Sequence, residues 1–109
     1  MPKVKYSPGA LEDLRHVRDY VSTAWGDAAA TKILKKISSD IRNLEQYPSS
    51  GVALGKTIDV STEYRYLFSE KNYIFYRLEA DNIRIIRVLN ERQDYLRQLF
   101  GINPEISED

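Results

Sequence analysis

The chain has 109 residues, of which 42% are hydrophobic and 29% are charged, and its formal net charge is zero. This profile is typical of one globular domain and excludes an intrinsically disordered segment. The uneven distribution of charge suggests a local anionic partner, without the strong overall basicity of a general nucleic-acid binder. Cysteine is absent and His16 is the sole histidine, so disulfides, thiolate metal sites and sites that need two histidines are excluded.

We expect neither a membrane-spanning segment nor a signal peptide in this sequence. No apolar run approaches the roughly 20 residues that a membrane-spanning helix requires. Residues 1–6 hold no apolar segment of signal-peptide length, so we expect a cytoplasmic protein without a membrane partner. We also expect no metal and no small-molecule cofactor, which leaves arginine, lysine, tyrosine, carboxylates and hydroxyls for any chemistry.

The N-terminal half predicts a short strand and two helices. Residues 4–6 favour a strand, and Ser7 followed by Pro8 is typical of a helix N-cap and first helical position. The first helix then carries one apolar stripe, formed by Leu11, Leu14, Val17, Val21 and Trp25. Gly26 and Asp27 interrupt this pattern. A second stripe follows, formed by Ile33, Ile37, Ile41 and Leu44.

Two amphipathic helices separated by so short a break predict an antiparallel helical hairpin. Pro48 ends the second helix, and residues 52–62 read as a loop. We expect the apolar stripe of the first helix, including Trp25, to be buried as part of the core or as an anchor of the hairpin.

The C-terminal half predicts a sheet. Residues 64–68, 73–78 and 83–89 are rich in aromatic and β-branched side chains, and residues 69–72 and 79–82 suit tight turns. A final short helix is expected over residues 90–100, stopped by Gly101. The predicted fold class is α+β: an antiparallel sheet of about four strands, the first at an edge, packed on an N-terminal helical hairpin. Residues 1–103 form the expected single domain, and 104–109 an acidic frayed tail.

Arginines on the predicted strands are the main candidates for binding. Strict alternation places Arg84, Ile86 and Val88 on one face of the last strand, and Ile85, Arg87 and Leu89 on the other. Arg87 therefore shares a face with apolar neighbours. It either forms an ion pair or covers the core with its aliphatic stem, or it presents a guanidinium that grips phosphate or carboxylate.

Other candidates lie beside aromatic side chains or near the C-terminus. Arg65 and Arg77 adjoin tyrosines, as nucleic-acid sites often do, although cross-strand packing explains the same pattern. Tyr95 lies close to Arg92, and a nearby arginine can lower the pKa of a tyrosine for acid–base work. The alternative is that the Tyr95 ring closes the core and leaves its hydroxyl in water.

Five segments of the sequence, taken in order, resemble the RelE/ParE superfamily of toxins. They are residues 6–14 (YSPGALEDL), 19–20 (DY), 44–48 (LEQYP), 73–77 (YIFYR) and 86–95 (IRVLNERQDY). The likeness covers residues 3–100, and the order and spacing of the set carry it. The resemblance implies the toxin of a type II toxin–antitoxin pair, a growth inhibitor held inactive by a cognate antitoxin, in a family that includes plasmid stabilisation proteins.

The resemblance implies one of two targets. RelE-like members are mRNA interferases that cut messenger RNA on the ribosome, and ParE-like members inhibit DNA gyrase. On the RelE pattern, Arg65 stands where a catalytic lysine is expected, and Asn90 where many relatives carry histidine. A reduced nuclease site would use Arg65, Arg92 and Tyr95 for catalysis, with Arg77 and Arg87 binding RNA, and the meander would gather Arg65, Arg87, Arg92 and Tyr95 at one end of the sheet. Enzyme activity stays open, as does a non-toxic interaction module on the same fold.

Overall fold

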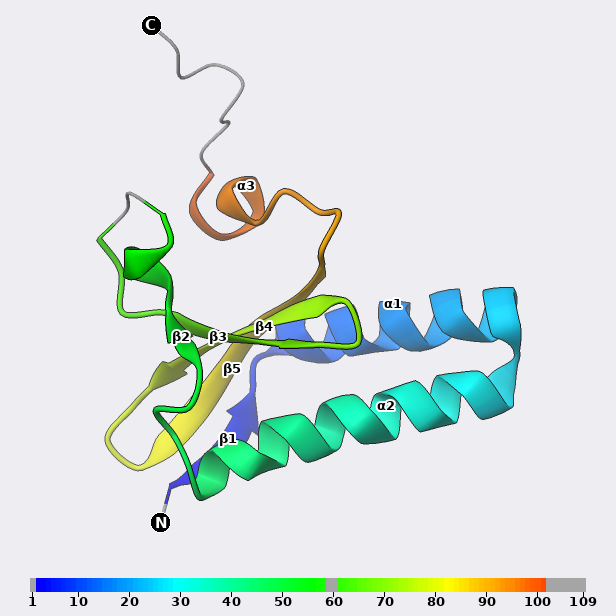
Figure 1. The fold of residues 1–109 in the computed structure, drawn as a ribbon, viewed down its shortest axis with the longest axis horizontal. Helices are drawn as coiled ribbons and strands as arrows, with labels where there is room; N and C mark the ends of the chain where they lie inside the picture. The colour runs from blue at the N-terminus through cyan, green and yellow to red at the C-terminus, as the bar shows by residue number, and fades with distance from the viewer. Residues whose placement is uncertain (1, 59–60, 102–109) are drawn as a thin grey trace, which may run out of the picture.

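The computed structural model describes residues 2–58 and 61–101. The elements, in chain order, are β1 (Lys3–Tyr6), α1 (Pro8–Trp25), α2 (Asp27–Arg42), a 3-10 turn η1 (Asn43–Glu45), β2 (Val52–Ala53), a second 3-10 turn η2 (Leu54–Lys56), β3 (Arg65–Ser69), β4 (Asn72–Leu78), β5 (Asn82–Asn90) and α3 (Tyr95–Phe100). This arrangement confirms the predicted α+β class with an N-terminal helical hairpin and a short C-terminal helix. Figure 1 shows the hairpin extending well beyond the sheet, with α3 set apart from it.

Local chemistry explains where the helices begin and end. The Ser7 hydroxyl accepts a hydrogen bond from the Ala10 amide at 3.0 Å, with Pro8 at the first helical position, as predicted. Gly26 separates α1 from α2 with a φ of 97°, a conformation that favours glycine. The last helix is shorter than predicted, because β5 continues to Asn90 and the Asp94 side chain caps α3 at the Arg97 amide.

The sheet has five strands in the order β1-β5-β4-β3-β2. The predicted meander is present as β3, β4 and β5, and β1 lies at an edge. The sheet is mixed, however, because β1 pairs in parallel with β5, from Lys3 opposite Asn82 to Tyr6 opposite Ile85. The fifth strand, β2, lies in the segment that the sequence predicts as a loop. Its two residues are too short a signal for a periodicity argument.

A β-bulge in β5 changes which side chains share a face. Phe75 pairs with Arg87 and Tyr76 pairs with Ile85, so Ile86 is left without a partner. As a result Ile85 and Val88 both pack into the core against the hairpin, and Leu89 packs on the opposite face. The strict alternation that the sequence predicts for this strand is therefore wrong after Ile85.

Two cores lie on the two faces of the sheet. The larger core joins the sheet to the hairpin, and its buried members are Ala10, Ile37, Ile41, Leu44, Ile74, Tyr76, Ile83, Ile85 and Val88. The smaller core lies on the other face, which we call the open face, where Leu54, Phe75 and Leu89 are covered by Tyr64, Tyr95 and Phe100 among others. The expected burial of Trp25 is wrong, because its side chain is 67% exposed near the tip of the hairpin.

Candidate functional site

Arg87 is bound by an aspartate of its own chain. Asp13 on α1 accepts hydrogen bonds from Arg87 Nε at 2.6 Å and from Nη2 at 2.9 Å, and it also accepts one from the Val88 amide at 2.9 Å. The Asp13 side chain is 9% exposed and that of Arg87 28%. The hydrogen bonds that the Arg87 guanidinium donates to Asp13 raise its pKa above the usual value. Of the alternatives for Arg87, the structure therefore supports the ion pair, with a carboxylate of the same chain as its partner.

The topology creates this ion pair. β1 covers the edge of β5 only as far as Ile85, and beyond that point the N-cap Ser7 and Asp13 of α1 supply the hydrogen-bond partners. The Ser7 hydroxyl donates to the Ile86 carbonyl at 2.7 Å, and Asp13 satisfies the Val88 amide, so side chains replace the missing strand. Gly9 leaves room for the arginine, because a Cβ there would lie 3.2 Å from Arg87 Cδ.

Arg65 fastens a loop to the sheet. Its Nη2 atom donates to the carbonyls of Ser49 at 2.9 Å and Gly51 at 2.7 Å. The buried Tyr76 hydroxyl supports the same loop, since it donates to the Pro48 carbonyl and accepts from the Gly51 amide, both at 3.0 Å. The guanidinium predicted to act in catalysis is thus engaged by backbone carbonyls of the segment after α2.

Arg77 lies on the open face and is paired with a carboxylate. Its Nη2 atom lies 2.7 Å from Glu79 Oε2, and Arg84 Nε lies 3.5 Å from the same oxygen. The hydrogen bond from Arg77 holds the pKa of Glu79 below its usual range. The Arg77 and Arg84 side chains are still 39% and 40% exposed, so both guanidinium groups can be reached from solvent.

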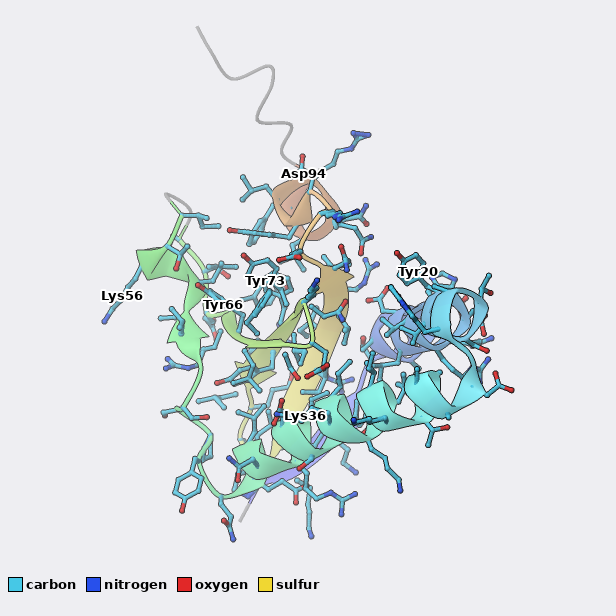
Figure 2. All side chains as sticks on the ribbon, turned by 45° about the vertical axis from the view of Figure 1, so that its right-hand side comes forward. Tyr20, Lys36, Lys56, Tyr66, Tyr73 and Asp94 are labelled. Carbon is cyan, nitrogen blue, oxygen red and sulfur yellow. The ribbon has the colours of Figure 1, made fainter. Side chains whose placement is uncertain are left out.

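Tyr95 is part of an aromatic cluster under α3. Its ring lies 5.3 Å from that of Tyr73 and 5.2 Å from that of Phe75. Burial raises the pKa of the Tyr95 hydroxyl, and the neighbouring hydroxyls of Tyr73 and Tyr66 act in the same direction. The lowering by a nearby arginine that the sequence suggests is therefore not found. Figure 2 shows Tyr66 and Tyr73 side by side beneath the start of α3, which Asp94 marks.

The predicted catalytic residues do not converge. Arg65 is the cross-strand partner of Tyr76. It lies four residues before Ser69, the end of β3 that is in register with Asn72 and Asn90. A strand rises about 3.3 Å per residue, so Arg65 lies roughly 13 Å from the end of the sheet that leads to Arg92 and Tyr95. Leu67 packs into the hairpin core, so Arg65 also belongs to the face opposite Tyr95. The expected gathering of Arg65, Arg87, Arg92 and Tyr95 at one end is wrong.

A groove that the sequence does not indicate lies between α1 and the far end of the sheet. Its volume is about 610 Å³, and it is lined by Val17, Val21 and Trp25 on one side and by Lys71, Asn72 and Arg92 on the other. Tyr20 and Trp25 are 63% and 67% exposed and meet edge to face, with ring centroids 6.1 Å apart. Figure 2 shows Tyr20 on the hairpin, well separated from the aromatic cluster. Exposure of two large aromatic rings could not be read from helical periodicity.

Two kinds of feature are absent from the described part of the chain, residues 2–58 and 61–101. No helix there is long and apolar enough to cross a membrane. No group of three or more histidine, cysteine, aspartate or glutamate side chains there could hold a metal ion.

Comparisons with known proteins agree with this architecture. Residues 4–95 match the family described as the ParE toxin of the type II toxin–antitoxin system parDE. A solved structure, described as the chromosomal ParDE toxin–antitoxin system from P. aeruginosa, aligns with a TM-score of 0.71 and 23% identity over 83% of this chain and 96% of that chain. A comparison with curated protein sequences gives no match.

Proposed function

The chain belongs to the ParE toxin family of type II toxin–antitoxin systems, and from that premise we propose that it arrests growth by binding DNA gyrase, without cutting RNA. Gyrase inhibition is the activity that the resemblance to ParE-like members implies. Its cognate antitoxin would neutralise it by covering the surface that the target needs.

The observation that carries this proposal is that two of the arginines predicted for a nuclease site, Arg87 and Arg65, are engaged by acceptors within the chain. Arg87 would have to leave a nearly buried carboxylate before it could grip a phosphate, and breaking such a pair is costly. Arg65 would have to release two backbone carbonyls. A nuclease that attacks through the ribose 2′-hydroxyl needs a base, an acid and cationic stabilisation close together. Among the described residues, the charged or polar groups that act on the Tyr95 hydroxyl are Tyr73, Tyr66 and Asp94, none of which is a cation.

The groove beside α1 supports an antitoxin partner. An amphipathic helix binds by placing apolar side chains into an apolar groove, and Val17, Val21 and Trp25 offer such a wall. The opposite wall carries Lys71 and Arg92 together with Glu70 and Glu91, so it suits a helix whose flank bears charges of both signs. Because binding occurs only to the folded toxin, the antitoxin should also raise its melting temperature by mass action.

The test is a short induction of the toxin in cells, followed by measurement of plasmid supercoiling and mapping of transcript ends. We expect relaxed or cleaved plasmid with intact messages, and relief of growth arrest when the antitoxin is co-expressed. Purified toxin should stop supercoiling of relaxed plasmid by gyrase and ATP. Fresh cuts within translated codons, with normal supercoiling, would contradict the proposal and favour the mRNA interferase. Normal growth with soluble toxin would favour the non-toxic module.

Substitution of Tyr95 separates a chemical role from a packing role. We expect Tyr95→Phe to remain fully toxic, because the ring and its contacts with Tyr73 and Phe75 are kept and no proton transfer is required. Tyr95→Ala should lower the free energy of unfolding by about 3 kcal/mol at most, since the residue is only half-buried. Toxicity is measured by growth after induction, at matched protein level. Loss of toxicity in a well-folded Tyr95→Phe variant would show that the hydroxyl acts chemically.

A further inference from the structure

Three basic side chains lie in register across three neighbouring strands of the open face. Arg77 on β4 is the cross-strand partner of Arg84 on β5, and Arg84 is in turn the partner of Lys5 on β1. We call these three residues the basic row. Neighbouring strands lie about 4.8 Å apart, so the row extends for roughly 10 Å across the sheet. The neighbours of Lys5 in β1, Val4 and Tyr6, pack toward the hairpin, which leaves Lys5 on the open face.

Such a row is unfavourable for stability by itself. Like charges that lie directly opposite one another on adjacent strands repel. One carboxylate oxygen of Glu79 offsets this repulsion, since it lies within 4 Å of both Arg77 and Arg84. Within residues 2–58 and 61–101, Lys5 forms no ion pair. Glu63 is a second acid that acts on Arg77. Lys3 adds a cation, because it lies on the same face of β1 as Lys5. The cations around the basic row therefore still outnumber these two acids.

From this arrangement we infer that the basic row binds the phosphate backbone of DNA, an inference that rests on the proposed action at gyrase, whose substrate is DNA. Arginine presents its donors as a planar fork that matches phosphate oxygens, and Arg77 and Arg84 are oriented toward one anionic oxygen already. A phosphate can take the place of the Glu79 carboxylate or add to it. Lys5 then supplies a third positive charge beside the same strand of DNA.

The surroundings of the row favour DNA over a peptide segment as its occupant. Peptides and proteins bind through apolar or aromatic anchors that fill pockets. The strongly exposed apolar side chains of the open face, Val52 and Phe68, lie on β2 and β3, whereas Lys5 lies on β1 at the opposite edge. The exposed rings of Tyr20 and Trp25 lie on the hairpin. A polar and basic strip of this kind suits contacts to a sugar-phosphate backbone, which need no sequence readout.

The experiment compares three purified, antitoxin-free toxin variants with the wild type. Arg77→Gln/Arg84→Gln removes two charges from the row, and Lys32→Gln/Lys35→Gln removes two exposed charges from α2 as a matched control. Glu79→Gln removes the competing carboxylate. Each is measured for binding of a short fluorescein-labelled DNA duplex by anisotropy over a range of potassium chloride concentrations, and for the toxin concentration that half-inhibits gyrase. Circular dichroism confirms the fold.

The expected results differ in sign between the variants. Each phosphate contact contributes about 0.9 to the log–log salt slope of DNA binding, so Arg77→Gln/Arg84→Gln should reduce that slope by about 1.8. The loss should be equal for duplexes of different sequence, and the control variant should keep the wild-type slope. Glu79→Gln should bind DNA more tightly than the wild type, a gain that misfolding cannot produce.

Several outcomes would overturn the inference. An unchanged salt slope in Arg77→Gln/Arg84→Gln, with gyrase still inhibited, rejects the basic row and leaves the proposed function intact. Weaker antitoxin binding by this variant, with unchanged DNA binding, assigns the row to the antitoxin instead. A preference for single-stranded RNA over the duplex would likewise reject it. Conversely, wild-type toxin that binds DNA through the row and leaves gyrase active rejects the proposed function alone.

Discussion

Asp13→Ala is expected to lower the free energy of unfolding by about 3 kcal/mol, near the lower end of the range for breaking a buried ion pair. The substitution leaves the Arg87 guanidinium and the Val88 amide without their shared acceptor. We place the effect at the lower end because the Arg87 side chain is 28% exposed, so that its guanidinium can be hydrated when Asp13 is removed. For a domain of this size the melting temperature should fall by roughly 15 °C. Urea unfolding followed by far-ultraviolet circular dichroism measures the change.

A matched control comes from the same helix. Asp19 also pairs with an arginine, Arg18, but its side chain is 63% exposed, so Asp19→Ala should change stability by less than about 0.5 kcal/mol. The double variant Asp13→Ala/Arg87→Ala should cost less than the sum of the two single variants, because it leaves no unpaired guanidinium. Additive effects, or a loss below about 1 kcal/mol for Asp13→Ala, would mean that the pair does not hold α1 to β5.

Gly51→Ala is expected to lower the free energy of unfolding by about 2–3 kcal/mol through overpacking. A Cβ at this buried position would lie 2.6 Å from the Tyr66 carbonyl oxygen and would also clash with the Tyr76 hydroxyl. The backbone there is fixed from both sides, because its amide donates to Tyr76 and its carbonyl accepts from Arg65. The loop cannot shift without breaking these bonds. Urea unfolding again measures the loss.

Two variants show whether the clash or the hydrogen bond is responsible. Ser50→Ala, at the exposed neighbouring position, should be neutral within about 0.5 kcal/mol. Tyr76→Phe removes the hydroxyl and should cost about 1–3 kcal/mol, because Gly51 N–H and the Pro48 carbonyl lose their partner. Combined with Gly51→Ala it should cost less than the sum, since the clash with the hydroxyl disappears. A stable Gly51→Ala protein would mean that the loop is free to move away from the sheet.

The turn between β3 and β4 shows what sequence composition can predict and what it cannot. The polar composition of residues 69–72 predicts a tight turn, and the structure joins β3 to β4 there with positive φ at Glu70 (50°) and Lys71 (66°). Neither residue is a glycine or asparagine, which usually carry such turns. Pairing of the flanking strands imposes this conformation, so composition alone could not have predicted its geometry.

Local sequence patterns predict the two helices of the hairpin, the three-stranded meander and the last helix, because each carries a local periodicity or a capping residue. The residues that begin and end the helices act only on the backbone next to them, so their effect can be predicted without a tertiary structure. They are Ser7, Pro8, Gly26 and Gly101. The resemblance to RelE/ParE toxins likewise rests on short local segments, and the family match over residues 4–95 confirms it.

Which arginines are available to a ligand depends on long-range contacts that no local pattern predicts. Periodicity placed Arg87 on a face, but the bulge at Ile86 and the short reach of β1 bring it to Asp13, 74 residues away in sequence. Arg65 is likewise committed to loop carbonyls that no local pattern predicts. The basic row depends on the register of β1, β5 and β4. The arginine side chain is long, and its guanidinium donates to whichever acceptors the fold brings near it. Packing and strand register therefore decide the role of an arginine, and its neighbours in sequence do not.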